Sequence, residues 1–297
     1  MDEKVLVLAG ACQSTMIYEY EVDDPQIEKV GGLYANKAVG GMGPGKALNF
    51  KKLGFSSSLY SVIGDDQPGD LVIDFLEENE IDFYYDIDEQ GTNTHINVMN
   101  SKGERNAIRI INPSFEPAIN LAKIEELIAD HDYVGLNVNN FCREAIPLLK
   151  KHNKDIWCDL GDYEVDNDYF ADFAEACEYV TMSGSKLEDP EQVVLDFIKQ
   201  GKKQVVVTLG KQGAIGMTQE SDLIKVPIID DFKMVDTNGA GDSFFVGMLY
   251  SHIKRYSLEK AMQLSTIVSG LTISSAQLFN EKLSAEYVEG KYREYFA

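Results

Sequence analysis

Residues 235–244 combine small residues, a carboxylate and a helix start in a pattern that can support phosphoryl transfer. Gly239-Ala240-Gly241 is followed directly by Asp242, and the apolar stretch Ser243–Tyr250 predicts a helix. The first amide groups of a helix have no partner within it, so they can bind an anion with help from the helix dipole. A carboxylate beside a bound phosphate can accept the proton of an alcohol. A turn followed by a helix cap is the alternative for so short a stretch.

A second glycine-rich segment nearly matches a phosphate-binding loop but lacks one of its components. Gly40 and Gly45-Lys46 fall at the expected spacing, but Ala47 replaces the hydroxyl that holds Mg²⁺. The preceding residues 33–39 are a poor buried strand, which argues equally against a dinucleotide fingerprint. We interpret the segment as backbone packed close to a ligand where the helix Gly45–Leu53 begins. A packing or turn role alone is the alternative.

A third segment, Gly64–Asp70, connects a predicted strand to a predicted helix. It is rich in Gly, Asp and Pro, which are typical of turns. Asp66 or Asp70 can cap the helix that follows. By itself this segment is therefore interpreted as structural.

The charge balance limits the classes of partner. The chain has 297 residues, with 49 acidic and 27 basic side chains and a formal net charge of −22. Nucleic acids and anionic membrane surfaces are bound through Lys and Arg, so neither is an expected partner. A small anionic ligand is still compatible with this composition, because a local group of backbone amides or one cation can hold it.

The apolar runs and the cysteines indicate the compartment. The first apolar run, Val5–Ala9, is too short for a signal-peptide core, and no segment has the roughly 18 uninterrupted apolar residues of a membrane span. Cys12, Cys142, Cys158 and Cys177 show no metal-binding spacing. We therefore expect four reduced, mostly buried thiols in a cytoplasmic protein.

Short apolar runs alternate with amphipathic stretches, which predicts repeated β-α units around a mainly parallel sheet. The predicted strands are Val5–Ala9, Ser58–Ile63, Tyr133–Val138, Asp155–Asp159, Tyr179–Met182 and Gln204–Leu209. The predicted helices are Gly45–Leu53, Gly69–Asn79, Leu121–Ala129, Glu144–Lys151, Asp168–Ala176, Glu191–Lys199, Asp242–Lys254, Ser257–Ser275 and Ala285–Tyr295.

Two stretches interrupt this alternation. Tyr18–Tyr34 is acidic and weakly patterned. Asp82–Ile111 contains three consecutive strand patterns, Phe83–Ile87, His95–Asn100 and Arg105–Ile111, with a hairpin turn before the third. Antiparallel strands inside an α/β pattern suggest a small separate sheet, for which a lid over a site is the natural role. An ordinary surface excursion is the alternative.

The stretch Asp236–Asp242 resembles the signature of the ribokinase family, also called the PfkB carbohydrate kinases. Further resemblances follow in the right order along nearly the whole chain. They are Gly40-Gly41-x-Gly43 before Leu53-Gly54, Ile63–Asp66 with Gly69, Gly91-Thr92 to Thr94, Gly103-Glu104-Arg105, and Val205–Gly210 with Gly213-Ala214.

The resemblance implies an α/β fold with a three-layer α/β/α Rossmann-like sheet and a small β-sheet lid. On this basis residues 1–12, 37–81 and 113–297 are expected to form the main domain, and residues 13–36 and 82–112 the lid. It also implies transfer of the γ-phosphoryl group of ATP, with Mg²⁺, to a hydroxyl of a sugar or sugar-like small molecule.

The family's site residues carry over by position. Asp242 is similar to the catalytic base, and Gly239, Ala240 and Gly241 to the anion hole. Thr208, Gly210 and Gly213 correspond to nucleotide-contacting positions, and Gly40 and Gly41 to the first, substrate-side signature. Asp236 and Asn238 fall where some members bind a monovalent cation such as K⁺. Glu188, three residues after Ser185, corresponds to the family's glutamate near the metal.

Three positions depart from the family. Five residues after Gly10, where many sugar kinases have a substrate-binding aspartate, the chain has Thr15. Gly45 stands where the first signature has an asparagine, and Ser185 replaces another asparagine. Either Gln13, Thr15 and Asn49 bind the acceptor differently, or the acceptor is not a plain pentose or hexose.

Other polar residues have weaker assignments. Asn139 ends a strand at the edge where α/β proteins bind ligands, so we expect it to contact the substrate. Arg105 or Arg109 on a lid strand can meet a phosphate or carboxylate of the substrate, with a solvated face as the alternative. His95 is interpreted as a half-exposed strand residue.

The sequence thus predicts an ATP-dependent small-molecule kinase. Lid closure excludes water, and Asp242 deprotonates the acceptor hydroxyl. A nucleoside or glycated-amine kinase of the same fold is the first alternative, and a non-catalytic binding protein is the second. An open lid edge needs a cover, which favours a homodimer through the lid.

Overall fold

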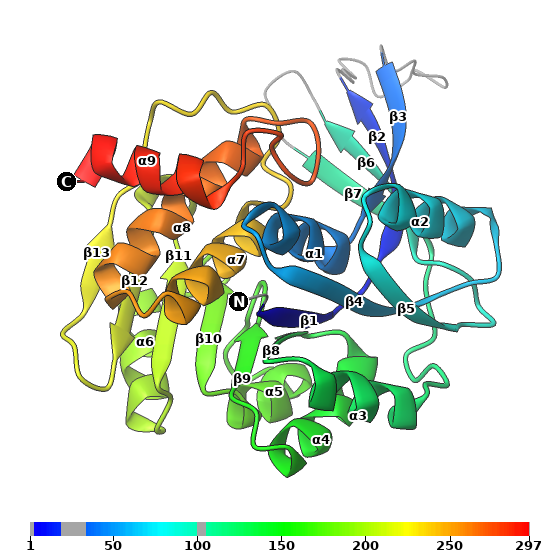
Figure 1. Ribbon diagram of the computed structural model, residues 1–297, viewed down its shortest axis with the longest axis horizontal. Coiled ribbons are helices and arrows are strands. Elements are labelled where there is room, and N and C mark those ends of the chain that lie inside the picture. Colours follow the sequence, from blue (N-terminus) through cyan, green and yellow to red (C-terminus); the bar gives the residue numbers. More distant parts are fainter. Residues whose placement is uncertain (1–2, 19–33, 100–104, 297) are drawn as a thin grey trace.

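The computed structural model describes residues 3–18, 34–99 and 105–296, and its centre is a sheet of nine strands (Figure 1). Their spatial order is β13-β12-β11-β10-β9-β8-β1-β4-β5. The strands are β1 (Lys4–Leu8), β4 (Ser56–Ile63), β5 (Asp82–Ile87), β8 (Tyr133–Asn137), β9 (Ile156–Asp159), β10 (Tyr179–Ser183), β11 (Gln204–Thr208), β12 (Ala214–Thr218) and β13 (Ile224–Val226). Neighbours from β11 to β5 pair in parallel, whereas β12 is antiparallel to both β11 and β13.

Helices cover both faces of this sheet (Figure 1). They are α1 (Met42–Lys52), α2 (Gln67–Glu78), α3 (Leu121–Asp130), α4 (Ala145–Lys151), α5 (Ala171–Ala176), α6 (Pro190–Lys199), α7 (Ala240–Ile253), α8 (Leu258–Ile273) and α9 (Ala285–Phe296). The alternation along β1 explains the layers, because Val5 and Val7 join the core formed with α1, α7 and α8. Leu6 and Leu8 join the second core, formed with α3, α4, α5 and α6. The three-layer α/β/α arrangement expected from the sequence is confirmed.

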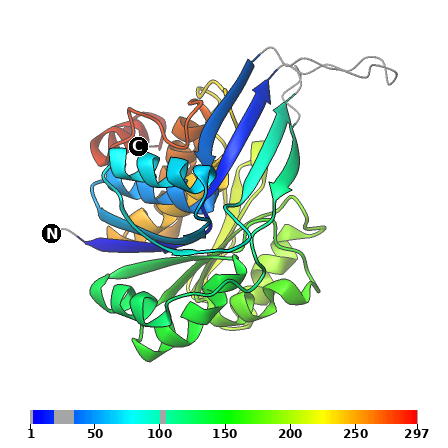
Figure 2. The same ribbon diagram turned by 90° about the vertical axis from the view of Figure 1, so that its right-hand side faces the viewer.

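A separate sheet of four strands, in the order β3-β2-β6-β7, forms the lid (Figure 2). Its strands are β2 (Cys12–Tyr18), β3 (Tyr34–Gly40), β6 (Thr94–Met99) and β7 (Arg105–Ile111). Two strands fall on the other side of the expected boundary between lid and main domain. Residues 82–87 form β5, which pairs in parallel with β4 at the edge of the main sheet. Residues 37–40, expected in the main domain, end β3 of the lid. The residues before the glycine-rich segment 40–46 are a poor buried strand by sequence, and they form the lid strand β3 instead of a strand of the main sheet.

The expected elements are present with boundaries shifted by a few residues. α1 begins at Met42 rather than Gly45, because Pro44 is compatible with the first turn of a helix. Residues 19–33 and the turn expected at residues 101–104 lie outside the described residues. The four cysteines are reduced and buried, as expected. Within the described ranges no helix is long and apolar enough to cross a membrane.

Asp66 joins the start of α2 to the chain that enters the lid. Its carboxylate caps α2 by accepting the amide of Gly69 at 2.9 Å. It also accepts both the amide and the hydroxyl of Thr92, at 2.8 and 2.6 Å, and that hydroxyl in turn accepts the amide of Gly64. The structural interpretation of this turn is therefore confirmed, and the same carboxylate also fixes the base of the lid.

Replacing Asp66 with Ala should lower the free energy of unfolding by about 1–2 kcal/mol at pH 7, because it removes three accepted hydrogen bonds, one of which caps α2. Burial alone would raise the pKa of this carboxyl, but the hydrogen bonds from Thr92 and Gly69 outweigh it and the pKa is lowered. The bonded carboxylate therefore stabilises the fold above its unfolded pKa of about 3.9, and this stabilisation disappears as the pH falls through its folded pKa. Urea unfolding at pH 7 and at acid pH measures both effects. The exposed neighbour Asp65 supplies the control, and an equal loss in Asp65→Ala would contradict the assignment.

Candidate active site

Close packing against α8 and the central sheet fixes the position of α7. Nearly every residue from Ser243 to Tyr250 is buried, so the helix has no solvent face along this length. A Cβ on Gly247 would lie 2.6 Å from Cα of Ser265 in α8, which shows how closely the two helices approach. A Cβ on Gly135 of β8 would meet the Phe245 ring at 3.0 Å. The N-terminus of α7 is therefore held rigidly near the carboxyl ends of the central strands.

Gly239, Ala240 and Gly241 form the turn into α7. Gly239 has a left-handed backbone with φ of 76°, and no side chain caps the helix there. A Cβ on Gly241 would meet nothing within 4 Å. The start of α7 therefore combines the amides of a helix N-terminus with open space, which is the arrangement expected for an anion site.

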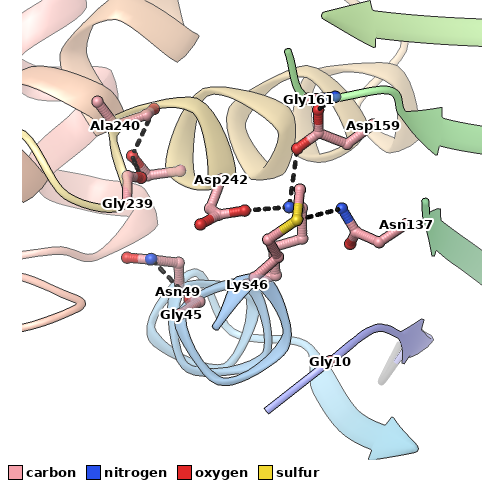
Figure 3. Close-up of polar contacts among 12 residues, drawn as sticks. Gly10, Gly45, Lys46, Asn49, Asn137, Asp159, Gly161, Gly239, Ala240 and Asp242 are labelled. Carbon is pink, nitrogen blue, oxygen red and sulfur yellow. Dashed lines mark hydrogen bonds and ion pairs between the residues drawn. The ribbon is translucent and has the colours of Figure 1, made fainter. Parts of the chain in front are cut away.

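Asp242, in the first turn of α7, is bound by a lysine that the sequence analysis did not assign a function. Nζ of Lys46 in α1 donates to Oδ1 of Asp242 and, at 2.8 Å, to Oδ2 of Asp159 at the end of β9 (Figure 3). The Lys46 side chain has no exposed surface, whereas the Asp242 side chain is 15% exposed. The Asp242 side chain is thus held from inside the protein at one oxygen and retains a small exposed surface.

Burial and the ion pairs act in opposite directions on these groups. Burial raises the pKa of the Asp242 carboxyl, and the Lys46 ammonium works against that rise. Burial lowers the pKa of the Lys46 ammonium, but Asp159 and Asp242 outweigh it, so the pKa is raised and the lysine is charged. Asp242 is therefore a carboxyl whose proton affinity is set mainly by its surroundings.

A buried polar row lies at the strand ends beside Lys46. The register pairs Asn137 of β8 with Asp159 of β9, and Asp159 with Thr181 of β10. Asn137 donates to the sulfur of Met42 at 3.6 Å, but its side-chain oxygen and the Thr181 hydroxyl have no partner within the described residues. Unpaired buried polar atoms are costly, and they are found where a ligand or water completes the bonding.

A cavity of about 330 Å³ lies where the lid faces the carboxyl ends of β1 and β8. Gly10, Ala11 and Asn139 form its floor, and Asp88, Asn93 and Arg109 contribute polar walls. Phe115, Phe141 and Tyr169 add aromatic surface, with the rings of Phe115 and Tyr169 6.3 Å apart. Apolar and aromatic walls with a few polar groups are typical of small-molecule sites.

The structure brings Asn139 into this cavity, as its strand-end position suggested. Oδ1 of Asn139 accepts the amide of Gly10 at 2.8 Å, which joins the ends of β8 and β1. Gly41 has φ of 89°, and a Cβ there would lie 2.5 Å from the Gly10 carbonyl oxygen, so this close approach requires glycine. The Gly43 amide donates to the same carbonyl at 3.1 Å. The packing alternative therefore accounts for Gly41.

Three other residues predicted to contact the substrate lie within the described part of the chain but do not line this cavity. They are Gly40, Gly45 and Asn49. A Cβ on Gly40 would lie 3.1 Å from both Cys12 and Ser14, and a Cβ on Gly45 would make only ordinary contacts. Asn49 is fully buried and donates to the carbonyls of Gly45 and Leu278, at 2.7 and 3.1 Å, so it connects α1 to the chain after α8. Arg105 begins β7, but its side chain lies outside the described residues.

Gln13 and Thr15 project from the lid face opposite to Arg109. Paired residues of adjacent strands share a face, and the register pairs Ser14 with His95 and His95 with Arg109. Arg109 lines the cavity, so Ser14 lies on the cavity side, where it accepts a hydrogen bond from Asn97 at 2.7 Å. Counting five residues from Gly10 therefore selects the face of β2 opposite to Ser14, because neighbouring strand residues alternate in direction, and the roles expected for Gln13 and Thr15 stay predictions.

The residues expected around the nucleotide and metal lie at the ends of β10 and β11 and at the start of α7. Thr208 ends β11 and is half-buried, and Gly210 and Gly213 both have positive φ in the turn that follows it. Ser185 is exposed and donates to Asp162 at 2.8 Å, and Glu188 is exposed nearby in sequence. A cavity of about 460 Å³ adjoins the turn, lined by Leu209, Gln212 and Ala214 and, across it, Glu191 and Lys225.

Asp236 is buried and accepts the Asn238 amide at 2.8 Å. No cluster of three or more potential metal-ligating side chains occurs among the residues whose structure is described. This donor set fits Mg²⁺ bound mainly through phosphates and water, because this ion keeps several waters and takes only one or two carboxylates. It does not fit a metal held by protein ligands alone.

Replacing Asn139 with Ala should lower the free energy of unfolding by about 0.5–1.5 kcal/mol, because the Gly10 amide loses its acceptor. Asn139→Asp keeps an acceptor at the same place and should retain most of that stability. Urea denaturation of the two variants beside the unchanged protein measures the difference. Equal midpoints for Asn139→Ala and the unchanged protein would show that the contact contributes nothing.

A family model described as pfkB family carbohydrate kinase matches residues 6–156 and 169–282. The acarbose 7(IV)-phosphotransferase of Actinoplanes sp. is 25% identical over 89% of both chains. An ATP-dependent 6-phosphofructokinase of Thermoanaerobacterium thermosaccharolyticum is 26% identical over 78% of both chains. A fructosamine kinase of Bacillus subtilis is 27% identical over 76% of this chain and 84% of its own.

Solved structures show the same fold over almost the whole chain. The microbiome-derived acarbose kinase Mak1 superposes with a TM-score of 0.88 at 24% identity, covering 98% of both chains. The ribokinase of Arabidopsis thaliana, complexed with ribose and ATP, superposes with a TM-score of 0.79 at 19% identity, also over 98% of both chains.

Proposed function

This chain belongs to the pfkB carbohydrate kinase family, and on that premise we propose that Asp242 is the base that deprotonates the acceptor hydroxyl. As a member of that family it is a phosphotransferase with an alcohol group as acceptor. In the proposed site, the amides of Gly239, Ala240 and Gly241 bind the transferring phosphoryl group of ATP. The observation that carries the proposal is the placement of Asp242. Its carboxylate lies in the first turn of α7 beside the open space at Gly241, with Oδ1 held by Lys46.

The proton transfer follows from this geometry. Oδ2 of Asp242 is the oxygen not engaged by Lys46, so it is the one available to the acceptor hydroxyl. As the acceptor oxygen attacks the γ-phosphorus, its proton passes to Oδ2, and the bond between the γ-phosphorus and the ADP oxygen breaks. The helix-start amides stabilise the charge of the group in transfer.

The nucleotide site proposed here is formed by Thr208 and the turn Gly210–Gly213, with Ser185 and Asn238 at its border. Mg²⁺, when bound with ATP, neutralises charge on the phosphates, and Glu188 would hold it through water. Asp236, together with Asn238, would hold K⁺ or another monovalent cation. The exposed position of Glu188 and the burial of Asp236 support these two roles.

The acceptor is proposed to bind in the cavity beneath the lid. The relatives named above act on acarbose, a phosphorylated fructose or a fructosamine, according to their names, so the family alone does not select one acceptor. The aromatic wall of Phe115 and Tyr169 favours an acceptor larger than one sugar ring, because a second ring can stack there. A pseudo-oligosaccharide and a nucleoside both satisfy this condition. Arg109 supplies a positive group for an acceptor that carries an anion.

A homodimer through the lid and a cytoplasmic location stay predictions. Ile108 and Ile110 of β7 are 53% and 54% exposed, which leaves apolar surface on the lid for a second copy to cover.

Replacing Asp242 with Asn should reduce kcat by about 10²–10⁴, because the positioned base is lost. The assay measures ADP release with ribose, fructose 6-phosphate, acarbose, a fructosamine and adenosine as acceptors. A thermal shift by MgATP should persist in the variant and shows that the nucleotide site is intact. Turnover near that of the unchanged protein, in a folded variant, would reject the assignment of the base.

Replacing Phe115 with Ala should raise KM at least several-fold for acarbose or adenosine and leave KM for single sugars unchanged. The reason is that Phe115, 64% exposed, contributes to the cavity wall but not to the strand ends near Asp242. Val165→Ala is a matched control, because Val165 is a comparably exposed apolar residue outside the cavity lining. An equal rise in KM for every acceptor would contradict a role in selecting size.

A further inference from the structure

Lys46 is a charged side chain in a place where a charge is costly. It is completely buried in α1, among residues that are themselves buried from Gly43 to Phe50. An ammonium group transferred from water to such a site is strongly disfavoured unless paired and hydrogen-bonded. The protein meets this condition with two carboxylates from different elements, Asp159 of β9 and Asp242 of α7. The ring of Phe245 lies 5.3 Å from the nitrogen.

Two carboxylates around one ammonium make an uneven set of charges. One positive charge faces two negative ones, so the three ionised groups sum to −1. Asp159 is almost as buried as Lys46, with 8% of its side chain exposed, and its other oxygen accepts the Gly161 amide at 3.0 Å. Asp242 has the most exposed side chain of the three. Asp159 therefore anchors the lysine from inside, and Lys46 in turn holds Asp242.

We propose that Lys46 is a positioning residue for the phosphoryl transfer: its ammonium holds Oδ1 of Asp242, opposes protonation of the carboxylate and leaves Oδ2 free for the acceptor. This inference rests on the proposed function, because it takes Asp242 as the base. Lys46 keeps its own protons throughout. The acceptor O–H bond breaks and its proton goes to Oδ2, an O–P bond forms, the bond from phosphorus to ADP breaks, and the proton later leaves to solvent.

Few other charges face this pair. Among the residues that the structure describes, the charged groups that shift the pKa of Asp242 are Lys46 and Asp159. Those that shift the pKa of Lys46 are Asp159 and Asp242. On β1, packed against α1, Lys4 pairs with Asp130 at the strand's opposite end. The described strand β4 carries no charged residue.

The other nearby charges are directed elsewhere. Lys37 of the lid strand β3 is exposed. Lys51 and Lys52, in the last turn of α1, pair with Glu80 and Glu281. On α7, His252 lies one residue before the helix ends, where it packs against Trp157 and Tyr179. Asp236 precedes α7 and bonds to the Asn238 amide.

The consequence of removing Lys46 has a definite sign. Without the ammonium, Asp242 would be a buried carboxyl that faces only the like charge of Asp159. Both burial and that like charge raise the pKa of Asp242, and the opposing cation would be gone. The base would then be protonated at a higher pH, and the acid limb of the rate profile would move upward. A purely structural role for Lys46 would change stability without moving that limb.

The test is Lys46→Met, with Lys123→Met as the matched control. Lys123 is a partly exposed residue of α3 that pairs with Glu126 and lies over the Tyr84 ring, away from Asp242, so its loss should leave the profile unchanged. The acid limb of kcat/KM, measured with the acceptor of highest turnover among ribose, fructose 6-phosphate and acarbose, should move up by about 1–3 pH units in Lys46→Met. An acid limb at the same pH as in the unchanged protein would overturn the proposal.

A second readout does not depend on catalysis. In protein labelled with ¹³C at aspartate Cγ, the NMR signal missing from Asp242→Asn identifies the carboxyl, and its titration gives the pH at which it binds a proton. That pH should be higher in Lys46→Met than in the unchanged protein. An unchanged titration would refute the contact, whereas full turnover in Asp242→Asn would refute the proposed function and leave the titration result standing.

The double variant Lys46→Met/Asp159→Asn tests the inference if the single variant fails to fold. It removes the cation together with its anchoring carboxylate, so Asp242 is the only one of the two carboxylates left without its partner. Asp242 should then titrate above its value in the unchanged protein and, where the single variant folds, below the value in Lys46→Met. A titration at or below that of the unchanged protein would overturn the proposal.

Discussion

A single buried ammonium group connects the three elements that form the proposed transfer site. Lys46 reaches from α1 to the end of β9 and to the first turn of α7, and each contact joins segments far apart in the chain. The loss of one partner is destabilising, because a lone charge in this interior is more costly than the pair itself. The relative positions of the helix-start amides, the base and the strand ends therefore depend on one electrostatic arrangement.

The chain's acidity and its anionic cofactor are compatible because the site does not depend on surface charge. The formal charge of −22 disfavours the approach of anionic ATP, and the protein has no excess of basic residues to offset it. The start of α7 instead offers backbone amides, which carry partial positive charge without any basic residue. The one lysine in the site is already neutralised by two carboxylates. In the proposed site, phosphate is recognised by the backbone, so the acidic surface can vary independently.

Local signals predicted much of the fold and the start of α7. The small residues at 239–241 before an apolar helix specify that site from a few neighbouring positions. The pairing of Lys46 with Asp242 spans 196 residues and depends on how α1 and α7 pack, so no local pattern shows it. One signal was available, since Lys46 is a charge inside a run of small and apolar residues. The pattern of β5 likewise identified a strand but not the sheet in which it pairs. For Thr15, the position is counted along the chain, and an error of one residue in such a count places the side chain on the opposite face of the strand.

The two parts of the proposed site come from separate regions of the fold. The proposed transfer residues lie on α1, β9 and the closely packed helix α7, whereas much of the cavity wall comes from the segment around Phe115, with Arg109 added from the lid strand β7. A substitution in the wall changes a surface that already borders solvent. A substitution beneath α7 disturbs the core. Such a division lets acceptor preference diverge through mutation while the chemistry is preserved, and it explains why shared architecture is a poor guide to which metabolite a given member of such a fold consumes.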